Sequence, residues 1–243
     1  MSFFENTRKP VGFGGEIMVA MMNLGHRALA RWGMGFLTLP ADGKVLDCGC
    51  GGGANIQKLL KKCPQGVVKG IDYSPVSVTK TRELNEQAVN DGRCVIWQGS
   101  VEQIIFAKDW FDVVTAFETV YFWPNLHRCF REVYRVLKSG GTFLICNECS
   151  GDTDKGDKWT RKIGGMTIYK DVQLKALLEQ AGFRDIQVHI SIARSLPKVL
   201  SVDRGSRSFL IQKPGCHVPQ GLLHGARLIC KAFRCCGMAE AAV

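Results

Sequence analysis

The sequence predicts an α/β fold, with a mostly parallel sheet of about seven strands and helices on both of its faces. Two observations support this prediction. Short apolar runs alternate with segments of helical spacing along most of the 243 residues. A glycine-rich turn at residues 49–54 also separates one of these apolar runs from the helical segment that follows it. Such an order of elements is typical of a doubly wound, Rossmann-like sheet.

Residues 1–40 are expected to form an N-terminal arm and a helix that acts as a lid. Between residues 15 and 37, apolar side chains recur at alternating steps of four and three, which predicts one continuous amphipathic helix. The packed face of this helix would consist of Met18, Met22, Leu29 and Trp32. If the helix only covers a site, deleting residues 15–37 should stop turnover and leave ligand affinity at the rest of the site within about tenfold, provided that the core stays folded.

A signal peptide is a competing interpretation of the same region. Basic residues precede a short apolar run, and an A-x-A sequence follows it. Glu16 borders that run, however, and His26 and Arg27 stand between the run and the A-x-A sequence. The same polar residues argue against a membrane-spanning helix. We therefore expect a cytoplasmic protein without a membrane span.

Residues 41–214 should form the main domain. The predicted strands are residues 44–46, 67–71, 94–97, 111–117, 142–146, 185–190 and 208–212. The fourth of these is apolar enough to be buried on both faces, as in a parallel sheet. The last two have no good helix between them, so we expect an antiparallel end to the sheet. Residues 215–243 match nothing in this scheme and form a C-terminal extension.

The helices of the main domain carry their own start and stop signals. One should follow the glycine turn, where Ile56, Leu59 and Leu60 have helical spacing. A second should begin at Ser74, with Pro75 in its first turn, and end near residues 91–92. A third should span about residues 126–137, ahead of a turn at residues 140–141. A fourth should be capped by Asp171 and end at Gly182.

Composition limits the classes of function. Hydrophobic residues make up 46% and charged residues 22% of the chain, as in an ordinary globular protein. The net charge of +10 would suit anionic partners, but the basic residues are scattered and form no long run. A basic, solvated surface is therefore a better interpretation than nucleic-acid binding.

The eleven cysteines favour reduced thiols over a disulfide framework or a zinc site. Cys146 and Cys149 form a single C-x-x-C pair, and no second pair stands at zinc spacing. Several cysteines lie in apolar strand patterns, where a thiol acts as a small hydrophobic side chain. We predict no metal site.

The glycine turn has the composition of a ligand-binding loop. Gly49, Gly51 and Gly53 can adopt positive φ angles and approach a ligand closely. The turn also satisfies the G-x-G-x-x-A pattern of nicotinamide sites. Asp47, two residues before the first glycine, would repel a pyrophosphate and attract an ammonium group. The helix start would attract a carboxylate, so a zwitterionic amino acid fits better.

Asp72 extends this interpretation. It ends the second strand, where a carboxylate can accept hydrogen bonds from both hydroxyls of a ribose, or alternatively cap the helix at Ser74. S-adenosylmethionine carries an amino-acid group at one end and a ribose towards the other, so it fits both ends of the predicted site.

Four segments, DCGCGGG, GIDYS, GSVEQIIF and REVYRVLKSGG, resemble the motifs of class I S-adenosylmethionine-dependent methyltransferases. The resemblance extends over about residues 45–213 and is to the small-molecule branch that includes ubiquinone- and menaquinone-type enzymes. It implies roles for eleven residues in cofactor binding. The methionine moiety would contact Asp47, Gly49, Cys50, Gly51 and Gly53; the nucleoside would contact Asp72, Tyr73, Ser100 and Val101; and Phe117 and Glu118 would lie beneath the cofactor.

The segment after the fourth strand should form the acceptor side. Glu118 is the leading candidate for a catalytic or acceptor-positioning group, with Tyr121 and Trp123 as aromatic walls unless they pack in the core. The Asn-Pro-Pro-Tyr-type motif of many nucleobase methyltransferases is missing, which argues against a flipped-base substrate. His26 is a candidate general base because histidine titrates near neutral pH, and Glu148 is a further candidate.

These observations predict an S-adenosylmethionine-dependent methyltransferase with a small-molecule methyl acceptor. The alternatives are a non-catalytic S-adenosylmethionine binder, an RNA-directed methyltransferase and, less favoured, an NAD-dependent oxidoreductase. The sequence identifies neither the acceptor, nor the atom that is methylated, nor the oligomeric state.

Overall fold

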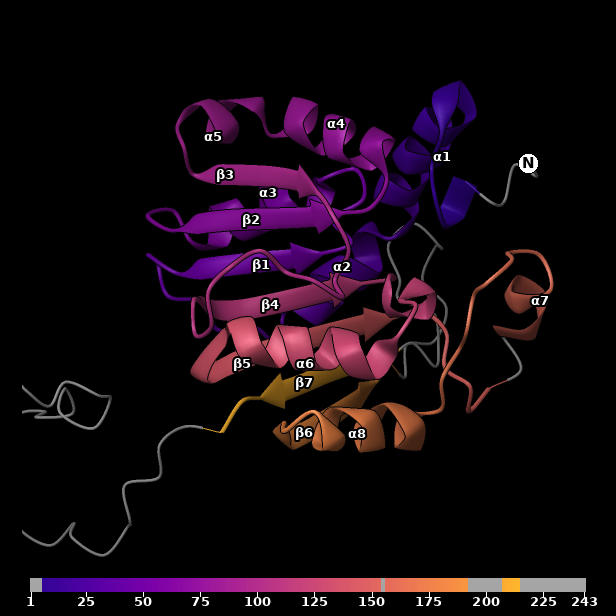
Figure 1. Cartoon of the computed structure of the whole chain (residues 1–243). Helices are drawn as coiled ribbons and strands as arrows, with labels where there is room; N and C mark the ends of the chain where they lie inside the picture. Colours follow the sequence, from indigo (N-terminus) through magenta and orange to yellow (C-terminus); the bar gives the residue numbers. More distant parts are fainter. Residues whose placement is uncertain (1–5, 154–155, 192–206, 215–243) are drawn as a thin grey trace, which may run out of the picture.

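Seven strands of the computed structural model form a single sheet in the order β3-β2-β1-β4-β5-β7-β6 (Figure 1). The structure describes residues 6–153, 156–191 and 207–214. The strands are β1 (Lys44–Cys48), β2 (Val67–Asp72), β3 (Cys94–Gln98), β4 (Phe111–Phe117), β5 (Leu137–Asn147), β6 (Arg184–Ile190) and β7 (Arg207–Gln212). All seven predicted strands are confirmed, with shifts at their ends.

The sheet is parallel except at β7. Strand β1 pairs in parallel with β2 and β4, β2 pairs with β3, and β4 pairs with β5. Strand β7 is antiparallel to both β5 and β6. The strand order therefore reverses between β1 and β4, and the carboxyl ends of these strands form the crevice where ligands bind in sheets of this kind.

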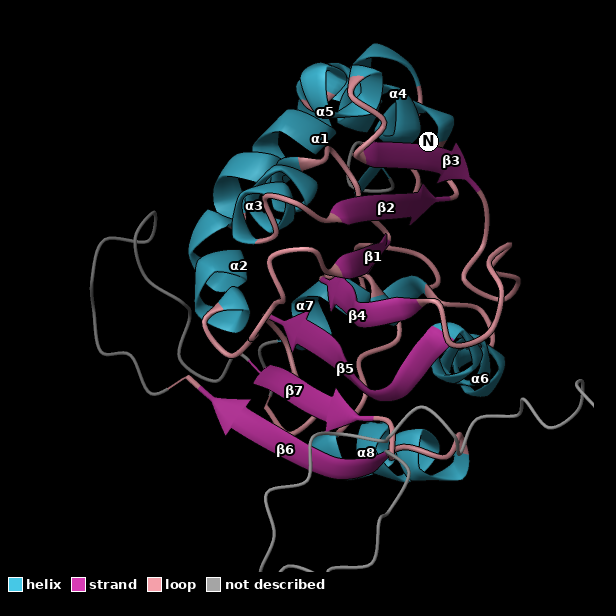
Figure 2. Cartoon of the chain, turned by 90° about the vertical axis from the view of Figure 1, so that its left-hand side faces the viewer, coloured by secondary structure: helices cyan, strands magenta, loops and turns pink. Residues whose placement is uncertain are grey.

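Helices cover both faces of the sheet, which confirms the doubly wound prediction (Figure 2). They are α1 (Gly12–Gly25), α2 (Arg27–Met34), α3 (Ala54–Lys62), α4 (Pro75–Leu84), α5 (Glu86–Asn90), α6 (Leu126–Val136), α7 (Asp157–Thr160) and α8 (Asp171–Gln180). Apolar residues of α2, α3 and α4 form one core cluster with the sheet. Residues of α6 and α8 form a second cluster on the other face.

The N-terminal region forms two helices, so the prediction of one continuous helix is wrong. His26 separates them with φ −91° and ψ 8°, and its backbone N–H donates to the Met22 carbonyl to close the end of α1 (3.0 Å). Helix α2 is part of the core, because its buried Leu29, Ala30 and Met34 pack with sheet residues. A Cβ on Gly33 would lie 2.7 Å from the Cys146 Sγ atom.

Because the region forms two helices, the expected result of deleting residues 15–37 changes. Removing residues 15–37 would take α2 out of the core and uncover the sheet, so the rest of the domain would not stay folded. Of these two helices, α1 has the position of a lid. Its Glu16 forms an ion pair with Lys80 of α4 (3.1 Å), and Asn23 donates to the Gly52 carbonyl (3.1 Å).

Several local predictions need correction. The segment predicted as one helix after Ser74 is divided into α4 and α5 at Asn85, and α7 lies between β5 and α8, where no helix was predicted. Strand β5 continues through the expected turn, with Gly140 at φ +76°. Helix α8 begins at Asp171, so the residue at its cap is Lys170.

The cysteines of the described residues agree with the sequence interpretation. All seven are buried, including Cys146 and Cys149. The four cysteines of residues 215–243, like the predicted extension itself, lie outside the described residues. Among the helices that the structure describes, none has the length and apolar character needed to cross a bilayer.

Candidate cofactor and acceptor site

A cavity of about 330 Å³ lies beside the crevice between β1 and β4. Segments that follow β1, β2, β4 and β5 line it, together with residues of α1. Of the eleven residues predicted to bind the cofactor, seven line the cavity: Gly49, Cys50, Gly51, Asp72, Tyr73, Phe117 and Glu118. His26 and Tyr121 line it as well, so the structure brings most of the predicted site together.

The glycine turn adopts the conformation that its sequence predicts. Gly49, Gly51 and Gly53 have φ angles of +76°, +53° and +80°. Gly49 donates to the Ile71 carbonyl (2.8 Å), which ties the turn to β2. Side chains would not fit at three of its positions: a Cβ on Gly49 would overlap Thr119, one on Gly52 would overlap Asn23 of α1, and one on Gly53 would overlap Thr81 of α4. The turn is therefore closely packed between β4 and the lid.

Asp72 orders the loops on both sides of the cavity. Its Oδ2 accepts from the Gly51 backbone N–H (2.9 Å), and its Oδ1 accepts from that of Ser74 (2.9 Å). Burial raises the pKa of this carboxyl group, and these backbone hydrogen bonds oppose the rise. The helix cap itself is Ser74, whose Oγ accepts from Ser77 (3.3 Å). Because a carboxylate oxygen can accept two hydrogen bonds, Asp72 retains capacity for a ligand hydroxyl.

Asp47 does not line the cavity, contrary to the contact expected from its position in the sequence. Its side chain turns beneath the glycine loop, is only 1% exposed, and accepts a hydrogen bond from the Thr115 hydroxyl (2.7 Å). Burial raises the pKa of Asp47 to about 7, although the Thr115 hydrogen bond opposes the shift. The carboxyl group therefore lies in the layer under the cavity.

The raised pKa of Asp47 predicts a pH-dependent contribution to stability. The folded chain holds the proton up to about pH 7, whereas the exposed group loses it near 3.8, so stability from this group falls as the pH rises between these values. Asp47→Asn cannot lose a proton, so the variant should gain stability relative to the wild type between pH 5 and pH 8. Denaturant unfolding at both pH values tests this.

Asp91→Asn, at an exposed position at the end of α5, provides the matched control for replacing an aspartate by asparagine. An Asp47→Asn variant whose stability runs parallel to the wild type would contradict the prediction.

Tyr73 links the cofactor end of the cavity to the N-terminal arm. Its hydroxyl donates to the Arg8 carbonyl, and the Lys9 ammonium lies 5.8 Å from the ring centroid. The Ser74 hydroxyl donates to the Pro10 carbonyl (2.8 Å), which fixes the same segment. The arm therefore closes the cavity beside Tyr73.

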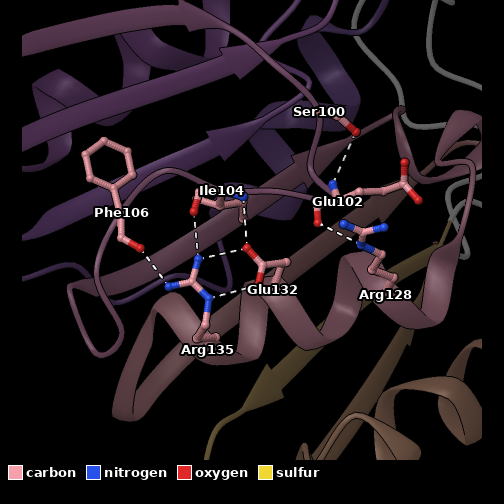
Figure 3. Close-up of polar contacts among 7 residues, drawn as sticks. All are labelled: Ser100, Glu102, Ile104, Phe106, Arg128, Glu132 and Arg135. Carbon is pink, nitrogen blue, oxygen red and sulfur yellow. Dashed lines mark hydrogen bonds and ion pairs between the residues drawn. The ribbon is translucent and has the colours of Figure 1, made fainter.

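Ser100 and Val101 are two further predicted residues that do not line the cavity. The Ser100 hydroxyl accepts from the Glu102 N–H (3.2 Å), and Val101 is buried in the core. Figure 3 shows how the loop that follows is held against α6: Arg135 contacts Glu132 and the Ile104 and Phe106 carbonyls, and Arg128 donates to Glu102. These contacts stabilise the loop, and a role in binding adenine stays a prediction for both residues.

The opposite end of the cavity brings together three ionisable side chains from distant parts of the sequence. His26 lies between α1 and α2, Glu118 follows β4, and Glu148 follows β5. His26 Nε2 lies 3.8 Å from Glu148 Oε2, and donor atoms of all three residues lie within 4.8 Å of one another. Each residue was a separate candidate in the sequence, and the fold unites them.

Glu118 is held firmly in this cluster. Its backbone has φ +59°, and its Oε1 accepts from the backbone N–H of Glu148 and lies 3.3 Å from the Tyr121 hydroxyl. Burial, with the neighbouring Glu148 carboxylate, raises the pKa of Glu118 to about 8. Burial lowers the pKa of His26 below its usual 6.5. Near neutral pH the cluster can therefore both donate and accept a proton.

Tyr121 has a positioning role. Its hydroxyl accepts from the Cys149 N–H (2.8 Å) and lies 3.1 Å from the Cys149 carbonyl, beside Glu118. Burial raises its pKa well above the usual 10, so the phenol stays protonated near neutral pH. Tyr121 therefore fixes Glu118 against the segment after β5.

His26, Glu118 and Glu148 are also the residues that could hold a metal ion, since they offer one imidazole nitrogen and two carboxylates at short range. The sequence predicts no metal site, and that statement stays a prediction.

Trp123 packs in the core, which is the second of the two interpretations that the sequence left open for it. It is 7% exposed, its ring contacts Phe130, and its Nε1 donates to the Thr119 hydroxyl (3.1 Å). The walls include instead Phe122, Trp159, Ile163 and Met166, three of which follow β5 in a polar loop. The sequence analysis did not predict Trp159, Ile163 and Met166 as part of the site. The signal that could have found them is the presence of large apolar side chains in an otherwise polar segment.

The comparisons with known proteins identify the domain. A family model described as a methyltransferase domain matches residues 46–145. Cycloartenol-C-24-methyltransferase of Arabidopsis thaliana is 32% identical over 152 residues, covering 59% of this chain and 45% of that protein. The chain thus spans less than half the length of this curated relative.

Solved structures show the same fold. The complex of the Haloferax volcanii Trm112 methyltransferase activator with a putative methyltransferase matches with a TM-score of 0.73 at 19% identity, covering 84% of this chain and 96% of that one. Phosphoethanolamine N-methyltransferase 2 of Haemonchus contortus, in complex with S-adenosyl-L-methionine, matches with a TM-score of 0.67 at 14% identity, covering 88% and 60%. Residues 46–145 therefore match a methyltransferase domain, and the fold of the chain is that of solved methyltransferases, one of them in complex with S-adenosyl-L-methionine.

Proposed function

We propose that the protein transfers the methyl group of S-adenosylmethionine to a small-molecule acceptor. One observation carries this proposal: a single cavity joins the glycine turn and Asp72 at one end to His26, Glu118 and Glu148 at the other. The first end suits the cofactor and the second suits a group that gives up a proton.

The cofactor end offers the groups that S-adenosylmethionine needs. The glycine turn brings backbone close to a ligand, and the start of α3 favours a carboxylate. Asp72 would accept from the ribose hydroxyls while it keeps its bonds to Gly51 and Ser74. Tyr73 would lie against the adenine. The cofactor supplies an electrophilic methyl group, and the chain has to hold that group in line with the acceptor.

The acceptor end is largely apolar. Met18, Met22, Phe117, Phe122 and Met166 line the cavity around the three ionisable side chains. Such a lining suits an acceptor that is mostly apolar and has one nitrogen or oxygen able to lose a proton. The name of the Arabidopsis relative, which refers to carbon 24 of cycloartenol, supports a small-molecule acceptor that is mostly apolar.

Glu118 is the residue that would take the proton. As the acceptor atom bonds to the methyl carbon, the carbon–sulfur bond breaks, its electron pair stays on sulfur, and the acceptor proton passes to the Glu118 carboxylate. Glu148 and Tyr121 would position Glu118. Helix α1 would exclude water, which strengthens the interactions of the charged groups.

Calorimetry and a turnover assay test the proposal together. S-adenosylmethionine should bind more tightly than NAD, and mass spectrometry should detect S-adenosylhomocysteine with panels of apolar amines, phenols or sterol-like alcohols. Tighter binding of NAD would overturn the proposal. Binding without turnover on any panel, or methyl transfer to RNA alone, would favour a cofactor-binding protein or an RNA-directed enzyme.

Asp72→Ala should weaken S-adenosylmethionine binding by tenfold or more. Hydrogen bonds to a charged group are worth about 1.5–3 kcal/mol each, and the variant would lose those to the ribose. Isothermal calorimetry measures the change, with Asp91→Ala as the control for removing a carboxylate from an exposed position. If a folded Asp72→Ala variant keeps the dissociation constant of the wild type, Asp72 does not bind the cofactor.

A further inference from the structure

The outer face of α1 carries an exposed apolar stripe. The structure describes ten exposed large hydrophobic side chains, and five of them lie in one short segment: Val11, Phe13, Ile17, Met21 and Leu24. The last four recur at steps of four, four and three, so they share one side of the helix. Phe13 is 79% exposed and Leu24 is 56% exposed. An apolar patch of this kind on a monomer marks an interaction surface.

The charges around this stripe favour an anionic partner. Glu16 is the one charged residue of α1, and Lys80 neutralises it. Exposed basic residues stand on both sides of the helix in the sequence: Arg8 and Lys9 before it, Arg27 and Arg31 after it. Arg27 and Arg31 form no ion pair within the described part of the chain.

The stripe also adjoins the cavity. Met21 is 55% exposed and at the same time lines the cavity, and Met18 and Met22 line it from the same helix. An apolar molecule held at the outer face of α1 would therefore reach the cavity along methionine side chains. The helix that carries the exposed stripe can therefore do more than close the cavity.

We propose that α1 docks on the surface of an anionic lipid bilayer. A helix of 14 residues is too short to span a bilayer, so it would lie in the interface with the stripe among the acyl chains. The flanking arginines and lysine would contact lipid phosphates. If the proposed function is right, an apolar acceptor would pass from the lipid into the cavity past Met21 without crossing water.

The charge pattern distinguishes this occupant from a second copy of the chain. Pairing two α1 stripes would bring the same four cations of each copy near those of the other, and one Glu16, already paired, could not balance them. An anionic bilayer offers acyl chains to the stripe and negatively charged headgroups to the cations. The docking surface is therefore better matched to a bilayer.

Vesicle co-sedimentation of the full chain tests the proposal without cofactor or acceptor, so it does not depend on methyl transfer. The protein should bind vesicles of phosphatidylcholine mixed with phosphatidylglycerol, and should bind pure phosphatidylcholine vesicles at least tenfold more weakly. Rising salt should release it, because headgroup attraction is screened.

Three double variants separate the contributions. Phe13→Ser with Ile17→Ser removes the stripe, and Arg27→Gln with Arg31→Gln removes two cations; each should weaken vesicle binding at least tenfold. Ile105→Ser with Val172→Ser removes two exposed apolar side chains elsewhere and should leave vesicle binding unchanged. None of these six residues lines the cavity, so S-adenosylmethionine affinity and the unfolding midpoint verify that each variant is folded.

Two results would overturn the proposal. One is vesicle binding that is absent, or that the stripe variant and the Ile105/Val172 control reduce equally. The other is a dimer in light scattering that the stripe variant dissociates while vesicles bind nothing, which would assign the stripe to a second copy of the chain.

Discussion

Replacing Gly49 by alanine should abolish measurable S-adenosylmethionine binding and destabilise the fold. Gly49 has φ +76°, where a non-glycine residue is strained by about 1–3 kcal/mol. Its added Cβ would overlap the Thr119 side chain, and relieving such an overlap costs about another 1–3 kcal/mol. Thr119 accepts the Trp123 hydrogen bond, so its movement would disturb the core as well. Denaturant unfolding and calorimetry measure the two effects.

Neighbouring glycines separate the causes of this effect. Gly51 has φ +53°, and no heavy atom lies within 4 Å of the place that an alanine methyl group would take, so Gly51→Ala should show the backbone strain alone. Gly52 has no positive φ, but its Cβ would overlap Asn23 and Val19, so Gly52→Ala should displace α1 and spare the core. If Gly49→Ala is no worse than Gly51→Ala and still binds S-adenosylmethionine, the contact with Thr119 does not matter.

The sequence predicted the sheet because the relevant signals are local. Buried parallel strands consist of short, continuous apolar runs, and β4 is an example with five consecutive buried residues from Val113 to Phe117. The positive φ angles at Gly49, Gly51 and Gly53 follow equally from residue type. These features need no knowledge of distant contacts, which is why they were found.

Orientation and pairing across the fold could not be predicted in the same way. Asp47 was expected to face the ligand, yet Thr115 on β4 draws its carboxyl group beneath the turn. Trp123 could equally have lined the cavity, and its contact with Phe130 in the core decided the outcome. The helix break at His26 depends on α2 packing against the sheet, which the helical spacing does not reveal.

The acceptor end shows the same limit more strongly. His26, Glu118 and Glu148 are separated by many residues, and the sequence offered them as three separate candidates. Their convergence within 4.8 Å follows from strand order, since β4 and β5 are neighbours and α2 packs under both. The sequence alone therefore does not show that these three side chains lie together, because their proximity depends on how the strands are ordered in the sheet.

Glu118→Gln should lower kcat/KM for methyl transfer by about 10²–10⁴-fold, the usual contribution of a general base. Glutamine keeps the size of the side chain and can still contact Tyr121 and the Glu148 N–H, but it cannot take a proton. Binding of S-adenosylmethionine should change by less than tenfold, because the variant removes no contact of the glycine turn or Asp72. Single-turnover and calorimetric measurements separate the two effects.

The pH dependence identifies which residue acts as the base. With a pKa of about 8, Glu118 is ionised in about a tenth of the molecules at pH 7, so kcat/KM of the wild type should rise with pH and level off above about 8. His26 has a pKa below 6.5 and is already neutral at pH 7, so a histidine base would give a flat profile in that range. Glu118→Gln should lose the rise and His26→Asn should keep it. A wild-type profile that is flat from pH 7 to pH 9, with Glu118→Gln nearly as active as the wild type, would remove Glu118 from the chemistry and leave its carboxyl group a positioning role.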